Sequence, residues 1–137
     1  MTDSLVLQVW QLKDPTHLPA LLAEDATFSS PVADYHGRDR AAHLLATIAT
    51  VLDSVHQTRQ WTDGPQGIFA FAARFADEEL QGVLREELSE SGELTHVTLF
   101  LRPYRVLRAA IAEMARRLED SPPPRAAQVA RITYSQG

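Results

Sequence analysis

Apolar side chains recur at helical spacing in four stretches of the chain, which predicts four helices. Residues 40–53 carry the clearest stripe, and Asp39 is placed to cap that helix with its carboxylate. Residues 106–118 show the same spacing and predict a closing helix. Residues 5–12 fit a short helix more loosely, and an Asp-Pro-Thr start signal predicts a further helix over residues 14–25.

The spacing of apolar side chains changes to a period of two in the centre of the chain, which is typical of β-strands. We expect strands over residues 55–62, 68–75, 80–88 and 93–102, joined by polar turns, and a shorter strand over residues 26–30 that a proline stops. Helices followed by an antiparallel meander, without βαβ alternation, predict the α+β fold class.

The alternation divides the predicted sheet into two faces. Two apolar rows, expected to form pocket walls or a solid core, consist of Phe69, Phe71, Ala73 and Phe75, and of Thr95, Val97, Leu99 and Leu101. The opposite face carries Arg85, Glu87, His96, Thr98 and Phe100. Because a face that mixes charge with an exposed phenylalanine suits an interface, we predict a homodimer through it.

Composition narrows the possible function classes. A chain of 137 residues is expected to form one domain, over residues 1–120. A net charge of -5 disfavours nucleic acid as a partner, and no apolar run is long enough to cross a membrane. The absence of cysteine excludes disulfides and thiolate sites, and the first residues lack the pattern of a signal peptide, so we expect a cytoplasmic protein.

Residues 121–137 form a separate tail that a run of three prolines opens. Proline favours an extended spacer and cannot continue a helix. Residues 129–134 alternate weakly and contain β-formers. Two expectations remain open: this run docks on a sheet edge or on the partner subunit, or the tail is disordered, as chain ends often are.

Two segments of the chain resemble a known family. LLAEDATFSSPV followed by YHGRDRAAHLLATI resembles the opening of ketosteroid isomerase-like and SnoaL-like proteins of the nuclear transport factor 2-like superfamily. SGELTHVTLFLRPYRVLRAAIAEMARRL resembles the ending of bacterial SnoaL-like sequences. The resemblance covers residues 5–120 and implies a cone-shaped curved sheet, about three to four covering helices, an internal pocket, a turn that contains Gly37, and a homodimer.

The catalytic positions that the resemblance implies hold unreactive residues. The general base of ketosteroid isomerase-like enzymes matches Ser30, and a serine hydroxyl is not a general base at neutral pH. The acid and the tyrosine of the oxyanion hole match Leu84 and Val6. We therefore expect no isomerisation of ketosteroids by that mechanism.

Glu86 is the candidate for a different acid or base. It shares a strand face with Leu84 and Leu88, so an inward face would bury its carboxylate and raise its pKa. The alternative, which we favour from the sequence, places Glu86 near a strand end in solvent.

The remaining candidates are ligand contacts. The expected set combines pocket-mouth residues with the apolar rows: Trp10, Ser30, Tyr35, His36, Trp61, Phe71, Phe75, Glu86 and Leu99. Aromatic and histidine side chains at such positions more often have a structural role than a ligand contact. The histidines show no metal-site spacing, and Gly37 has no phosphate-loop context, so we expect no metal and no cofactor.

Two functions follow from these observations. The first is a pocket protein that binds a small apolar molecule, with cyclic compounds among the candidates, and that either has no reaction or acts as a lyase, isomerase or hydrolase. The second is a non-catalytic module for dimerisation or protein binding. A deep pocket into which Glu86 or a histidine points favours the first function, whereas a filled core or a pocket without ionisable groups favours the second.

Overall fold

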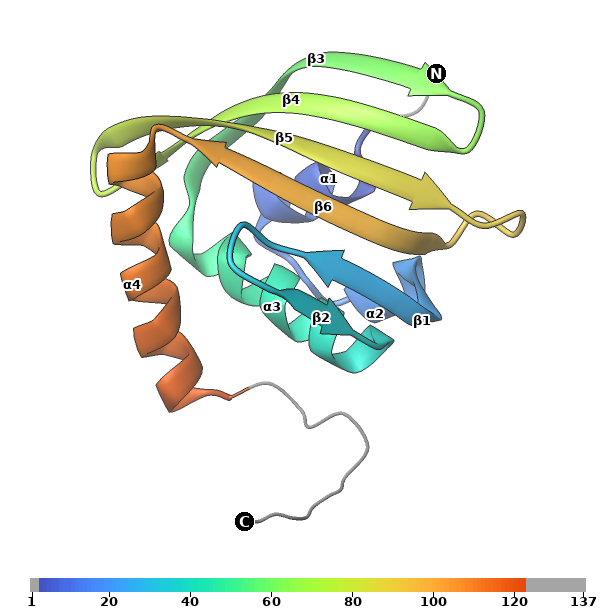
Figure 1. Cartoon of the computed structure of the whole chain (residues 1–137), viewed down its shortest axis with the longest axis horizontal. Coiled ribbons are helices and arrows are strands. Elements are labelled where there is room, and N and C mark those ends of the chain that lie inside the picture. The colour runs from blue at the N-terminus through green and yellow to red at the C-terminus, as the bar shows by residue number, and fades with distance from the viewer. Residues whose placement is uncertain (1–2, 123–137) are drawn as a thin grey trace.

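The computed structural model describes residues 3–122, which form a six-stranded sheet in the order β2-β1-β6-β5-β4-β3, with four helices (Figure 1). The helices are α1 (Leu5–Leu12), α2 (Leu18–Leu21), α3 (Arg38–Val51) and α4 (Tyr104–Asp120). The strands are β1 (Leu22–Ser29), β2 (Asp34–His36), β3 (Asp53–Asp63), β4 (Gln66–Phe75), β5 (Glu78–Leu88) and β6 (Leu94–Arg102). The predicted α+β class is confirmed.

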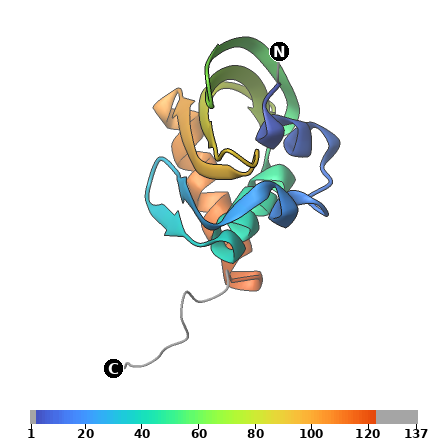
Figure 2. The same ribbon diagram turned by 90° about the vertical axis from the view of Figure 1, so that its right-hand side faces the viewer.

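The sheet is curved, unclosed and mixed. Strands β3 to β6 form the predicted antiparallel meander, which is confirmed, and β1 pairs with β6 in parallel, which the sequence analysis did not predict. A long connection through α3 and the four strands β2 to β5 separates β1 from β6, so no tight hairpin forces the two strands to run antiparallel. Figure 2 shows the meander curling around the space that α1 and α3 close.

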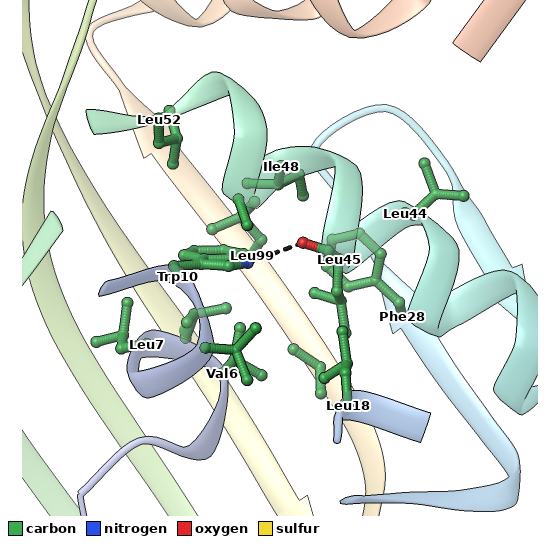
Figure 3. Packing of buried hydrophobic residues seen from close by; sticks show 14 of the residues in the cluster. Val6, Leu7, Trp10, Leu18, Phe28, Leu44, Leu45, Ile48, Leu52 and Leu99 are labelled. Atoms are coloured by element: carbon green, nitrogen blue, oxygen red, sulfur yellow. Dashed lines mark hydrogen bonds between the residues drawn. The ribbon is translucent and has the colours of Figure 1, made fainter. Parts of the chain in front are cut away.

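The helices cover the concave face of the sheet. Trp10 of α1 is buried there, donates from Nε1 to the Leu45 carbonyl of α3 at 3.0 Å, and meets the Phe71 ring edge-on at 5.7 Å (Figure 3). The predicted inner rows are buried at Phe69, Phe71, Ala73, Val97 and Leu99. Thr95 is an exception, because an irregularity in the pairing with β5 brings Leu94 inward instead.

Three local predictions near the start of the chain are wrong. The helix expected over residues 14–25 is only α2, because Leu22 already pairs with Leu94 of β6 and starts β1. The turn expected around Gly37 includes the short strand β2, which pairs with β1. Gly37 itself is the N-cap of α3, with φ of 95°, so Asp39 lies in the first turn and does not cap the helix.

The two expectations for the tail, residues 121–137, concern residues that lie mostly outside the described part of the chain. Ser121 follows α4 directly, and its carbonyl oxygen accepts from His43 Nε2 of α3 at 2.7 Å. Among residues 3–122 the structure holds no helix of the length and apolar character that a membrane crossing requires.

Candidate functional site

An apolar groove of about 170 Å³ lies between α3, α4, the end of β6 and the loop that follows β1. Its walls are leucine, isoleucine, valine, alanine, methionine and aromatic side chains with one serine and one proline: Phe28, Ser30, Pro31, Val32, Tyr35, Leu44, Ile48, Val51, Leu52, Leu99, Leu101, Leu107, Ala110, Ile111, Met114, Ala115 and Leu118. Figure 3 shows part of its floor, where Ile48, Leu52 and Leu99 converge. The residues that line the groove come from two segments far apart in the sequence, residues 28–52 and 99–118.

The loop at the groove rim is held by Ser30. Its hydroxyl oxygen accepts from the N–H groups of Val32 and Ala33 at 3.2 and 3.1 Å, and its own N–H donates to the Ala33 carbonyl at 2.8 Å. This arrangement is a serine turn, which Pro31 favours by its fixed φ. The Ser30 hydroxyl is therefore a structural group that organises the rim.

Tyr35 of β2 forms the neighbouring wall. Its ring stacks on Phe28 with the centroids 6.2 Å apart, and the Arg40 guanidinium lies 5.6 Å from the same ring. The hydroxyls of Ser30 and Tyr35 are the polar side-chain groups of the wall. No carboxylate, histidine, lysine or arginine is among the described residues that line the groove, so the lining offers none of the side chains that usually act as a general base.

Glu86 is buried, with 4% of its surface exposed, so the favoured interpretation of a solvated side chain is wrong. Its carboxylate accepts from the Ser4 hydroxyl and from the N–H groups of Leu5 and Val6 at 3.2 and 3.3 Å. The register between β5 and β6 explains this burial, because Glu86 lies opposite Val97, which is buried on the inner face of the sheet.

The surroundings of Glu86 act on its pKa in two directions. Burial, the larger influence, raises the pKa, and the hydrogen bonds from Ser4, Leu5 and Val6 lower it. The carboxylate borders a separate cavity of about 160 Å³, whose walls include Asp3 and the hairpin between β3 and β4. Glu86 thus caps the N-terminus of α1 and is not among the residues that line the apolar groove.

The other expected ligand contacts are dispersed. The groove brings together Ser30, Tyr35 and Leu99. Trp10 and Phe71 belong to the core, and Phe75 is partly buried against it. His36 is exposed beside Thr27, and Trp61 is 51% exposed on β3 with the Arg59 guanidinium 5.4 Å from its ring. Within residues 3–122 no three His, Asp or Glu side chains gather as metal ligands.

Sequence reasoning missed the contribution of the closing helix. Leu107, Ile111, Met114, Ala115 and Leu118 line the groove, although their periodicity indicated only that α4 covers the core. In fact α4 fully buries only Val106 and Ala110. The signal in the sequence was the width of the apolar stripe on α4. An amphipathic helix usually buries most of its stripe, so a stripe wider than the buried face indicates a further apolar surface.

Comparison with solved structures identifies the fold family. The structure matches a steroid delta-isomerase from Pseudomonas aeruginosa with a TM-score of 0.78 and 32% identity, over 82% of this chain and 85% of that one. A bacterial protein with a cystatin-like fold from Silicibacter pomeroyi matches with a TM-score of 0.80 and 25% identity, over 85% and 84% of the two chains.

A ketosteroid isomerase-like protein from Catenulispora acidiphila, solved with trimethylamine, matches with a TM-score of 0.55 and 15% identity, over 72% of this chain and 86% of that one. At that identity it supports the fold alone. No protein-family model and no curated protein matches the chain. The predicted resemblance is confirmed by the structural matches and by the identity to the steroid delta-isomerase: the chain belongs to the nuclear transport factor 2-like superfamily.

Proposed function

We propose that the protein binds a small apolar molecule in the groove between α3, α4 and β6, without acid–base catalysis at that site. The observation that carries this proposal is the composition of the wall, where two hydroxyls are the polar side-chain groups among seventeen lining residues. Apolar walls with a few placed polar groups are typical of ligand pockets. The hydroxyl of Tyr35 is the natural partner for a single polar group on the ligand.

The size of the groove limits the ligand class. Its volume of about 170 Å³ is similar to that of an engineered apolar cavity of roughly 150 Å³ that binds benzene. One ring therefore fits inside, and a larger molecule extends beyond the rim. We propose a ligand with an apolar ring or a short branched chain at the end that enters.

Because the chain is similar to a steroid delta-isomerase, isomerisation of a steroid is the alternative to binding alone. Three observations favour binding without that reaction. Ser30 stands at the position of the base and is engaged in a turn, and Val6 and Leu84, at the oxyanion positions, are fully buried apolar side chains. Glu86 gives little support to an alternative enzyme, because its carboxylate already accepts three hydrogen bonds at the start of α1.

Isoleucine methyl groups offer a direct test of ligand binding. The chain has four isoleucines, of which Ile48 and Ile111 line the groove and Ile68 lies on β4 away from it. We expect a titration with toluene, as a small apolar probe, to shift the Ile48 and Ile111 methyl resonances and to leave Ile68 in place. Shifts of all three resonances, or of none, would contradict binding in the groove.

Two matched substitutions on α4 sharpen the test. Ala115 is exposed and lines the groove, whereas Ala112 is exposed on the same helix and is not among the lining residues. Ala115→Trp places an indole in the groove, so we expect the affinity for toluene to fall at least about tenfold, the loss of about 1.4 kcal/mol. Ala112→Trp is expected to bind toluene like the unmodified protein. Equal affinities of the two variants would refute the assignment.

A further inference from the structure

The buried carboxylate of Glu86 pairs with no cationic side chain among residues 3–122, although only 4% of its surface is exposed. The three hydrogen bonds that it accepts come from one hydroxyl and two backbone N–H groups at the start of α1, which are neutral donors. A helix N-terminus offers the equivalent of roughly half a positive charge, so α1 compensates an ionised carboxylate only in part. Glu86 therefore lacks the opposite charge that a buried charge usually has beside it.

A cavity of about 160 Å³ borders this carboxylate. Its walls come from the start of α1, the hairpin between β3 and β4, and the strands β4 and β5: Asp3, Leu5, Thr62, Gly64, Pro65, Gln66, Gly67, Phe69, Glu86 and Leu88. Two of these described residues carry carboxyl groups, and none of them is a lysine, an arginine or a histidine. The cavity thus combines the size of a small-molecule site with a negatively charged lining.

An aromatic ring lies beside Glu86 in the same cavity. Gly67 pairs with Glu86 across β4 and β5, and a Cβ atom at Gly67 would lie 2.6 Å from both Cε2 and Cζ of Phe69. The Phe69 ring therefore covers the place next to Glu86 that a side chain at residue 67 would take. Because the face of an aromatic ring attracts cations, the ring and the carboxylate favour the same kind of ligand.

We propose that this cavity binds a small organic ammonium ion, with the ammonium group at the Glu86 carboxylate and the apolar part of the ligand against Phe69 and Leu88. A carboxylate has about four acceptor positions, of which the donors of α1 use three, so one remains for an N–H group of the ligand. The apolar walls suit an organic cation better than Ca²⁺, which takes about six to eight oxygen ligands.

The volume of the cavity limits the ligand to one ring or a short chain, since an apolar cavity of roughly 150 Å³ holds benzene. The cavity shares no lining residue with the apolar groove, so this site is independent of the function proposed above. A protein that fails to bind toluene in the groove can still bind an ammonium ion here, and the reverse also holds.

Titration of the full-length protein with n-butylammonium tests the site, and 1-butanol is the uncharged molecule of similar shape. We expect butylammonium to shift the methyl resonances of Leu5 and Leu88, which line the cavity, and to leave Ile48 of the groove in place. We expect 1-butanol to bind at the cavity at least about tenfold more weakly, because it lacks the charge-assisted hydrogen bond. Equal affinities of the two molecules, or shifts confined to Ile48, would overturn the proposal.

Three substitutions locate the charge that binds. Glu86→Gln keeps a carbonyl oxygen for the donors of α1 but removes the charge, so the affinity for butylammonium should fall at least about tenfold. Glu87→Gln, at the neighbouring glutamate on the opposite face, should leave it unchanged. Asp3→Asn should change it little, because water screens an exposed carboxylate. No loss in Glu86→Gln, or an equal loss in Asp3→Asn, would contradict binding at Glu86.

The carboxyl ¹³C resonance of Glu86 provides a test on the unmodified protein, which also serves if Glu86→Gln does not fold. Burial raises the pKa of Glu86, and a bound cation favours the ionised form, so butylammonium should lower that pKa and bind more tightly as the pH rises through it. Asp3 is the other titratable group among the described lining residues, and its own resonance separates the two. A titration curve of Glu86 that butylammonium does not move would overturn the proposal.

Discussion

At the residue scale, Ser30 has a structural role at the rim of the groove. In ketosteroid isomerase-like relatives the resemblance assigns a carboxylate base to this position. Here the hydroxyl organises the loop at the groove rim by accepting from Val32 and Ala33. A serine hydroxyl is too weak a base to remove a carbon-bound proton at neutral pH.

The unmodified protein is predicted not to isomerise a Δ5-3-ketosteroid, measured by the ultraviolet absorbance of the conjugated product. Ser30→Asp alone is expected not to create the activity, because Val6 and Leu84 supply no oxyanion donors, and each lost donor costs about 10²–10³ in rate. Turnover by the unmodified protein above the rate in buffer would refute both this prediction and the alignment of Ser30.

At the scale of elements, the attachment of α1 to the sheet depends on one carboxylate. Glu86 of β5 receives the N–H groups of Leu5 and Val6 and the Ser4 hydroxyl, while the Ser4 oxygen accepts from Leu7 N–H at 3.0 Å. A helix N-terminus favours a negative charge because its first N–H groups lack partners within the helix. Strand β5 thereby positions α1, whose Trp10 packs into the core.

Glu86→Ala is predicted to lower the free energy of unfolding by about 1–3 kcal/mol, because buried donors at the start of α1 lose their acceptor. Glu87→Ala is the matched control: the neighbouring glutamate points to the opposite face, where its partly exposed carboxylate pairs with Arg85 at 3.2 Å. Such surface pairs contribute about 0–1 kcal/mol. Urea denaturation of the two variants measures both values, and equal losses would contradict a capping role.

The pH dependence of stability follows from the same burial. Because burial raises the pKa of Glu86 above its ordinary value of 4.5, the folded protein binds this proton more tightly than the unfolded chain. The contribution of Glu86 to stability therefore falls as the pH rises from about 4.5 through the raised pKa. Relative to the unmodified protein, Glu86→Gln is predicted to gain stability over that window, which urea denaturation at several pH values measures. A constant difference between the two proteins would contradict the raised pKa.

At the scale of the whole molecule, the outer face of the sheet is the second surface with unexplained apolar groups. Phe100 is 58% exposed there, and together with Ala70, Ala72 and Val83 it lines a shallow hollow of about 390 Å³. Under twofold symmetry the same surface of a second copy meets this one, so each copy offers both an exposed ring and a hollow. We therefore propose that this face forms the homodimer interface.

Light scattering at micromolar concentration is predicted to give the mass of a dimer, and Phe100→Asp is predicted to give a monomer. The substituted carboxylate would be buried without a partner in the interface, which is strongly unfavourable. Tyr104→Asp removes an aromatic side chain that is 71% exposed at the start of α4, and it should leave the dimer intact. A monomeric unmodified protein, or an equal effect of both substitutions, would contradict this interface.

Local periodicity by itself determined most of the architecture. The stripes of α3 and α4 and the alternation of β3 to β6 predicted these elements, because each pattern reports which side of an element avoids water. The family resemblance at both ends of the chain predicted the cone-shaped fold. The alignment that places Ser30, Val6 and Leu84 at the catalytic positions also comes from the sequence alone, and it stays a prediction.

Tertiary structure decided what depends on contacts between distant segments. The extension of β1 to Leu22 and its parallel direction come from pairing with β6, and a strand's own sequence does not identify its neighbour. The burial of Glu86 depends on α1, about eighty positions away, which supplies the hydrogen bonds that make a buried carboxylate tolerable. The groove exists because α4 packs against α3 and leaves part of its apolar stripe uncovered. Periodicity in the sequence indicates how wide such a stripe is, but not how much of it a neighbouring element covers.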